Sequence, residues 1–184
     1  MLVRGLSAGG GNGQAAEATT ISAEASPTTT NTLPVTSSSA SPKPTPPAPP
    51  GQADVSAVAG DPDAVAVGQT LSEYFIGVNG RDFDTAYAVF SPALRGRIGF
   101  EEWSSGLGTT TDSAVVVVGL ERSADGAVLA QTRFTSEQSA ENGPVAGQTC
   151  TNWTLTYTLV PNIDGPTAFQ IDAVADVGPG HTAC

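Results

Sequence analysis

The sequence predicts an α+β domain in which three N-terminal helices pack on a curved four-stranded antiparallel sheet, preceded by a disordered linker. All eleven aromatic residues lie between Tyr74 and Phe169, so only that part of the chain can form a large core. Apolar residues recur at helical spacing from about residue 62 to 107 and at every second position from 114 to 177. Helices followed by a run of strands are typical of α+β domains.

Residues 1–60 are predicted to be a disordered tail and linker, and residues 61–184 to form the folded domain. Of the first 60 residues, 42 are Ala, Gly, Pro, Ser or Thr, and eight of these are proline. Such a composition buries too little apolar surface to offset the entropy lost on ordering. The remaining 124 residues are enough for one hydrophobic core.

The first helix is expected to begin at Asp61 and Pro62, a capping acid and a proline at the first helical position, and to end at Asn79 and Gly80. Its apolar face consists of Val67, Leu71, Tyr74, Phe75 and Val78. Two shorter helices are expected over 82–90, capped by Asp82 and stopped by Pro92, and over 100–107. A loop is expected between them.

Four strands are expected over 114–120, 127–135, 151–160 and 169–177, with tight turns at 123–126 and 161–166. Successive strand residues face opposite ways. The third strand therefore places Trp153, Leu155 and Tyr157 on one face. The inner face of the last strand would hold Phe169, Ile171, Ala173, Ala175 and Val177.

Cys150 and Cys184 are the only cysteines, and the last one ends the chain. A hairpin of the last two strands brings residues near Cys150 opposite Gly178, and a fold-back at 178–180 would let Cys184 reach Cys150. A disulfide is therefore expected, with two unpaired thiols as the alternative. Structural disulfides persist outside the reducing cytoplasm, which predicts an extracytoplasmic protein whose export signal is not present in this chain.

The formal charge of −11 argues against a nucleic-acid partner, which would require clustered Lys and Arg. No apolar run is long enough for a membrane span. His181 is the only histidine and lies in a Gly- and Pro-rich tail, so no Ser-His-Asp site is expected. The Cys and His residues are too few for zinc and the acids too dispersed for calcium. No metal or cofactor is expected.

The segment YFIGVNGRDFDTAY at residues 74–87 resembles the start of nuclear transport factor 2-like domains. A similarity over about residues 62–184, together with the Ser/Thr/Pro-rich stretch and the Cys-Thr-Asn-Trp strand, is closest to secreted members from high-GC bacteria. The resemblance implies a cone-shaped fold that serves isomerases, cyclases, hydrolases and non-catalytic binding modules. Catalytic members place an acid or base inside the cone, and the nearest candidates are Tyr74, Tyr157, Asp172 and Asp84. None of these is assigned a catalytic role.

A mostly apolar cavity is expected between the helices and the inner face of the sheet, with no acid facing into it. Its expected lining is Leu71, Tyr74, Phe75, Tyr87, Trp103, Trp153, Leu155, Tyr157, Phe169 and Ile171. The preferred hypothesis is a non-catalytic extracytoplasmic binding or accessory module at the cell envelope, on a flexible stalk, with a small apolar ligand or an envelope protein as partner. The alternatives are an isomerase- or cyclase-type enzyme, and a structural domain that forms a homodimer through the outer face of its sheet.

Overall fold

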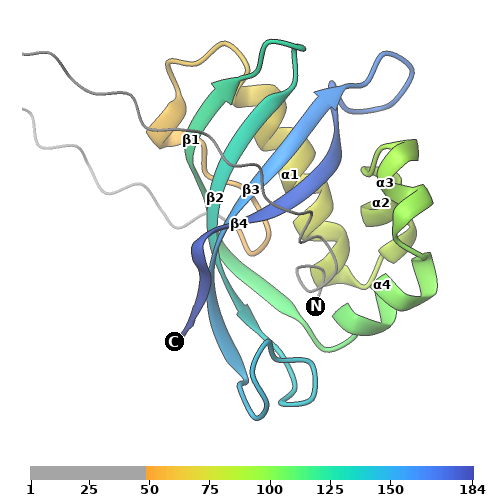
Figure 1. The fold of residues 1–184 in the computed structure, drawn as a ribbon, viewed down its shortest axis with the longest axis vertical. Helices are drawn as coiled ribbons and strands as arrows, with labels where there is room; N and C mark the ends of the chain where they lie inside the picture. The colour runs from red at the N-terminus through yellow and green to blue at the C-terminus, as the bar shows by residue number, and fades with distance from the viewer. Residues whose placement is uncertain (1–48) are drawn as a thin grey trace, which may run out of the picture. The chain divides into compact units, whose positions relative to one another are not determined.

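A computed structural model describes residues 49–184, so the expected linker lies largely outside the described residues. Within this part, a short 3-10 helix η2 (Ser56–Val58) precedes four α-helices. These are α1 (Ala64–Gly80), α2 (Phe83–Ala88), α3 (Pro92–Arg97) and α4 (Phe100–Leu107). Figure 1 shows the α-helices on one side of the sheet. None of these helices has the length and hydropathy of a membrane span.

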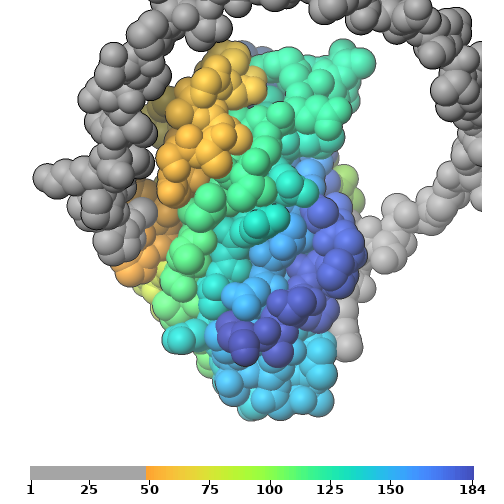
Figure 2. Space-filling view, turned by 90° about the vertical axis from the view of Figure 1, so that its left-hand side faces the viewer, coloured from red at the N-terminus to blue at the C-terminus, as the bar shows by residue number. Residues whose placement is uncertain are grey.

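The four strands form one open antiparallel sheet in the order β1-β2-β3-β4. They are β1 (Thr111–Arg122), β2 (Val128–Glu137), β3 (Cys150–Pro161) and β4 (Phe169–Ala183). The α+β class and the four antiparallel strands predicted from the sequence are confirmed. Figure 2 shows the sheet face opposite the helices, where the strands run side by side.

The folded part starts earlier than the expected Asp61. The backbone of Asp54 pairs with β1, since its N–H donates to the Val115 carbonyl at 2.8 Å and its carbonyl accepts from the Val117 N–H at 2.9 Å. Ala53 is buried, and its N–H donates to the Ser72 hydroxyl of α1. Residues 51–58 therefore belong to the domain, because their few apolar side chains and backbone groups complete the edge of β1.

A fourth helix, α3, lies where the sequence predicts a loop. Ser91 caps it by accepting the Leu94 N–H at 3.0 Å, and Pro92 occupies its first turn. Proline at that position needs no N–H donor, so Pro92 both stops α2 and starts α3. Leu94 is fully buried in the core. The expectation of three helices is therefore wrong for the described residues.

The end of α1 also differs from the expectation. Gly80 is still helical, and Arg81 rather than Asn79 or Gly80 takes the left-handed conformation, with φ 62°. The Asp82 carboxylate accepts the Thr85 N–H and caps α2, as expected. The side chains of Asn79 and Arg81 are consequently free for contacts with the start of β1, described below.

β4 is longer and less regular than expected. A bulge at Asp172 shifts its register, so that Val174 rather than Ala173 or Ala175 is buried on the inner face. A second irregularity lies between the pairs Leu155–Asp176 and Trp153–His181. Gly178 and Gly180, both with positive φ, accommodate that detour. The strand then resumes its pairing, so the C-terminus reaches Cys150 without the expected fold-back.

Candidate functional site

A cavity of about 60 Å³ lies between α1, the C-terminal end of α4 and the inner face of the sheet, and it opens to the surface. Its walls combine aromatic and aliphatic side chains with a smaller set of polar ones. The lining residues are Tyr74, Phe75, Leu107, Thr110, Asp112, Phe134, Ser136, Gln138, Asn142, Trp153, Leu155, Tyr157 and Val174. This combination is typical of a ligand site.

Half of the lining predicted from the sequence lies on these walls. Tyr74 and Phe75 come from α1, and the alternate residues Trp153, Leu155 and Tyr157 come from β3. The aromatic rings contact one another around the cavity. The ring centroids of Phe75 and Phe134 are 4.9 Å apart, and those of Tyr74 and Tyr157 are 6.3 Å apart.

The other predicted lining residues fill the core instead. Leu71 and Ile171 are fully buried, and Phe169 is 6% exposed. Trp103 packs on Tyr87, with ring centroids 5.4 Å apart. The Tyr87 hydroxyl is committed to the helix layer, because it donates to the Ile98 carbonyl at 2.6 Å. The helices thus fill the centre of the domain, and the cavity lies at its end near the start of β1.

Asp112 lies on the cavity wall, contrary to the expectation that no acid faces inward. It is 4% exposed and accepts a hydrogen bond from the buried Ser136 hydroxyl of β2. Burial raises the pKa of Asp112 to about 6, against the opposing effects of the Ser136 hydrogen bond and the Arg81 charge. A carboxyl group in this state changes its charge close to neutral pH.

A bulge in β1 explains why strand periodicity misses Asp112. Val115 and Val117 are buried on the inner face, and strict alternation would continue to Ser113. The ladder with β2 gains one residue between the pairs Ser113–Thr135 and Val116–Arg133, where Ala114 has φ 51°. The extra residue turns Ser113 outward and Asp112 inward. No signal in the local sequence marks this reversal.

The end of α1 positions Asp112 through its backbone. The Asn79 side-chain amide donates to the Asp112 carbonyl at 2.8 Å, and its oxygen accepts the Asp112 N–H at 2.7 Å. Arg81 Nη1 donates to the carbonyls of Val78 and Thr110 at 2.8 and 2.6 Å. The Asn-Gly-Arg segment thus does more than end a helix, because it fixes the chain that carries the buried acid.

Two buried tyrosines contribute hydroxyl groups to the wall. Tyr74 and Tyr157 are 6% and 3% exposed and come from α1 and β3. Burial raises the pKa of each hydroxyl above its ordinary value, and the Asp112 charge adds to both shifts. The hydroxyls therefore keep their protons at neutral pH and are available to donate to, or accept from, a bound molecule.

The Trp103 indole N–H lies near this cluster without an acceptor. Its Nε1 is buried and forms no hydrogen bond with another described residue. The Trp103 and Tyr74 rings pack with centroids 6.4 Å apart. Trp103 therefore acts on the cavity through Tyr74 and not as part of its wall.

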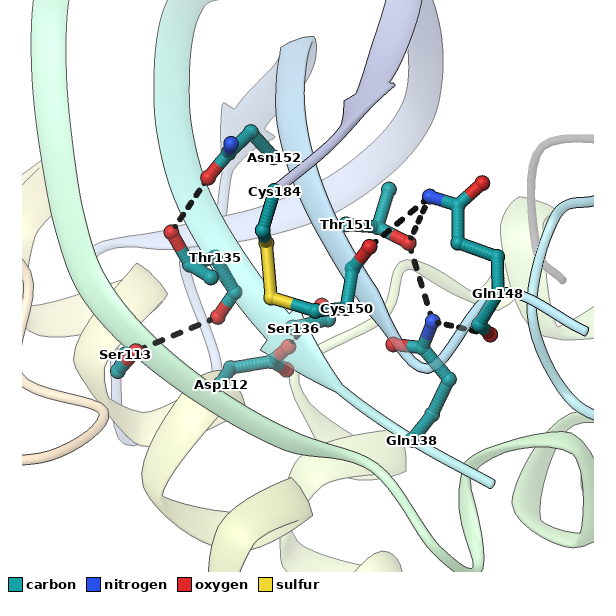
Figure 3. The surroundings of a disulfide bond; sticks show 10 residues. All are labelled: Asp112, Ser113, Thr135, Ser136, Gln138, Gln148, Cys150, Thr151, Asn152 and Cys184. Carbon is teal, nitrogen blue, oxygen red and sulfur yellow. Dashed lines mark hydrogen bonds between the residues drawn. A yellow bond between two sulfur atoms is a disulfide. The ribbon is translucent and has the colours of Figure 1, made fainter. Parts of the chain in front are cut away.

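Side-chain amides and a buried hydroxyl form a polar network beside the cavity (Figure 3). Gln138 and Gln148 each donate through Nε2 to the Thr151 hydroxyl, at 3.0 and 2.7 Å. Gln148 Nε2 also donates to the Cys150 carbonyl at 3.0 Å. Because Gln138 is a lining residue, this network ties the cavity edge to the disulfide region.

The disulfide between Cys150 and Cys184 is confirmed, with the two Cα atoms 5.5 Å apart. It joins the first residue of β3 to the residue that follows β4 (Figure 3). The adjacent His181 packs on Trp153, with ring centroids 5.1 Å apart. The C-terminal residues therefore contact a cavity-lining ring from the neighbouring strand.

The remaining candidates lie apart from the cavity. Asp172 accepts a hydrogen bond from Ser91 at the bulge of β4, and Asp84 is exposed in the first turn of α2. In the part of the chain that the structure describes, no three His, Cys, Asp or Glu side chains gather as a metal site. No protein-family model matches the chain, and no curated protein matches it either.

Proposed function

We propose that residues 49–184 form a non-catalytic binding module that acts outside the cytoplasm at the cell envelope and holds a small molecule in its cavity. The observation that carries this proposal is the open cavity of about 60 Å³, which five aromatic residues and the buried Asp112 line together. Buried polar groups in proteins are nearly always hydrogen-bonded. A bound molecule that donates to the Asp112 carboxylate would satisfy the acceptor positions that Ser136 leaves open.

Two features support the proposed location. The disulfide favours an oxidising compartment, since such bonds rarely persist in a reducing cytoplasm. The Pro-, Ser- and Thr-rich sequence before Pro49 has the composition of a flexible stalk. The proposal includes membership of the nuclear transport factor 2-like superfamily, with its cone-shaped fold. Helices packed against a four-stranded antiparallel sheet support this part of it.

A ligand screen with a cavity-filling variant tests this function. The full-length protein is screened by NMR against small uncharged and charged molecules, in parallel with Val174→Phe, which places a larger side chain on the cavity wall. Val160→Phe is the matched control, because Val160 is also a strand valine but is half-buried and lies on the outer face. Binding that Val174→Phe abolishes and Val160→Phe retains supports the module. Binding that both variants retain contradicts it.

The second candidate is an isomerase- or cyclase-type enzyme, which Asp112 favours. A carboxylate with a pKa raised to about 6 can accept a proton near neutral pH, and Tyr74 and Tyr157 can donate hydrogen bonds to a carbonyl oxygen beside it. Such a site would remove a proton from the carbon next to the carbonyl and return it. Exchange of those protons of butanone in deuterated water, measured by NMR and lost in Asp112→Asn, would support the enzyme over the binding module.

A further inference from the structure

We infer that the cavity binds a small organic cation, the protonated amino group of an alkylamine, which pairs with Asp112 and is enclosed by aromatic rings. This inference rests on the proposed ligand-binding function and adds the charge class of the ligand. It follows from three properties of the site: its single acidic residue without an ion-pair partner, the chemistry of its walls, and its size.

Asp112 is the only Asp, Glu, Lys, Arg or His among the lining residues. One hydrogen bond, from Ser136, uses one of about four lone-pair positions that a carboxylate offers. No Lys, Arg or His of the described residues forms an ion pair with it. A buried carboxylate without a cation is costly, and a ligand that brings a positive charge and N–H donors removes that cost.

The charged and titratable groups around Asp112 leave the remaining acceptor positions of its carboxylate open. Arg81, at the end of α1, is exposed and uses Nη1 on two backbone carbonyls, at 2.8 and 2.6 Å. Tyr74 of α1 and Tyr157 of β3 share the cavity wall with the carboxylate and are neutral. β2 contributes Ser136 and Gln138, and neither of these side chains carries a charge. None of these nearby groups therefore forms an ion pair with the Asp112 carboxylate.

The remaining walls suit a cation and not an anion. Five aromatic residues line the cavity: Tyr74, Phe75, Phe134, Trp153 and Tyr157. Aromatic faces attract ammonium groups, and the attraction grows where water is excluded. No lining residue offers the Lys or Arg that an anionic ligand would need. The tyrosine hydroxyl oxygens can accept N–H donors that the carboxylate does not reach.

The size of the site limits what enters it. A cavity of about 60 Å³ accommodates a head group of a few non-hydrogen atoms, since one water molecule occupies about 30 Å³ of the liquid. The opening to the surface lets the rest of a longer ligand extend outward. Propylammonium, propanol and propanoate are therefore suitable probes, because they are similar in size and differ in charge.

The test titrates the full-length protein with each probe at about pH 7.5, where Asp112 is ionised, and follows the Trp153 indole and backbone amides by NMR. We expect propylammonium to bind at least about tenfold more tightly than propanol, and propanoate not to bind. Asp112→Asn should weaken propylammonium at least about tenfold and leave propanol within about twofold. Asp172→Asn is the matched control, because Asp172 also accepts a serine hydroxyl but lies outside the cavity.

The pH dependence of probe affinity, measured on the unaltered protein, is a second test. Propylammonium affinity should rise as the pH increases through about 6, because only the ionised Asp112 pairs with a cation, whereas propanol affinity should not rise. Equal or tighter binding of propanol, a cation affinity unchanged by Asp112→Asn, or no binding of propylammonium overturns the inference. The screen with Val174→Phe separately decides whether the cavity binds ligands at all, so the two failures are distinguishable.

Discussion

The Asn79 side chain forms two hydrogen bonds with the backbone of Asp112, at 2.8 Å to its carbonyl and 2.7 Å from its N–H. This pairing joins the last turn of α1 to the start of β1, residues that are 33 positions apart. It holds the one residue whose carboxylate is buried on the cavity wall. The hydrogen bonds of Arg81 to Val78 and Thr110 lie directly beside it.

Asn79→Ala should lower the free energy of unfolding by about 2 kcal/mol, because it removes two partly buried hydrogen bonds worth about 1 kcal/mol each. The amide signals of residues 110–112 should shift most. Chemical denaturation and NMR measure these effects. Asn162→Ala, in the β3–β4 turn, is the control and should change stability by less than about 0.5 kcal/mol. If Asn79→Ala lowers the free energy of unfolding by no more than this control does, the pairing does not hold β1.

Asp112→Asn should remove a specific pH dependence of stability. The folded protein holds the Asp112 pKa near 6, above its ordinary value of 3.8, so the folded state binds more protons between these values. Stability therefore falls as the pH rises from about 4 to above 6, by up to about 3 kcal/mol. Asparagine cannot ionise but still accepts from Ser136. The unfolding free energy of Asp112→Asn should consequently lack this decrease, and identical pH profiles for both proteins would contradict the raised pKa.

Replacing both cysteines by serine, Cys150→Ser with Cys184→Ser, should destabilise the domain by about 4 kcal/mol, because the disulfide closes a long loop with a sequence separation of 34. Urea denaturation without reductant measures the loss. The unaltered protein under reducing conditions is the control and should behave like the variant. Intact-mass measurement should find no alkylation of the unfolded, unreduced protein, and two added labels would exclude the bond.

Limited digestion with a nonspecific protease should leave a fragment that begins before Gly51. The backbone pairing of Asp54 with β1 and the burial of Ala53 protect this segment from local unfolding. Mass measurement of the resistant fragment identifies its first residue. A stable fragment that begins at Asp61 or later would show that residues 51–58 are not held by the domain.

The sequence by itself determined the α+β class, because apolar residues recur at helical spacing in one part of the chain and at every second position in another. The structure has α1 in the first part and β1–β4 in the second. The sequence also determined the disulfide, since Cys150 and Cys184 are the only thiols and hairpin geometry brings them together. Five lining residues of the cavity followed from the same apolar spacing. These features depend on local pattern and chain connectivity, which a sequence contains directly.

Only the tertiary structure decided that Asp112 faces inward. One extra residue in β1 reverses the alternation between Val115 and Asp112, and its position is set by pairing with β2 and by the hydrogen bonds of Asn79. The same kind of register shift in β4 turned Val174 inward in place of its neighbours. Bulges arise from how two strands fit together, so the charge of the site depends on contacts between segments far apart in the chain.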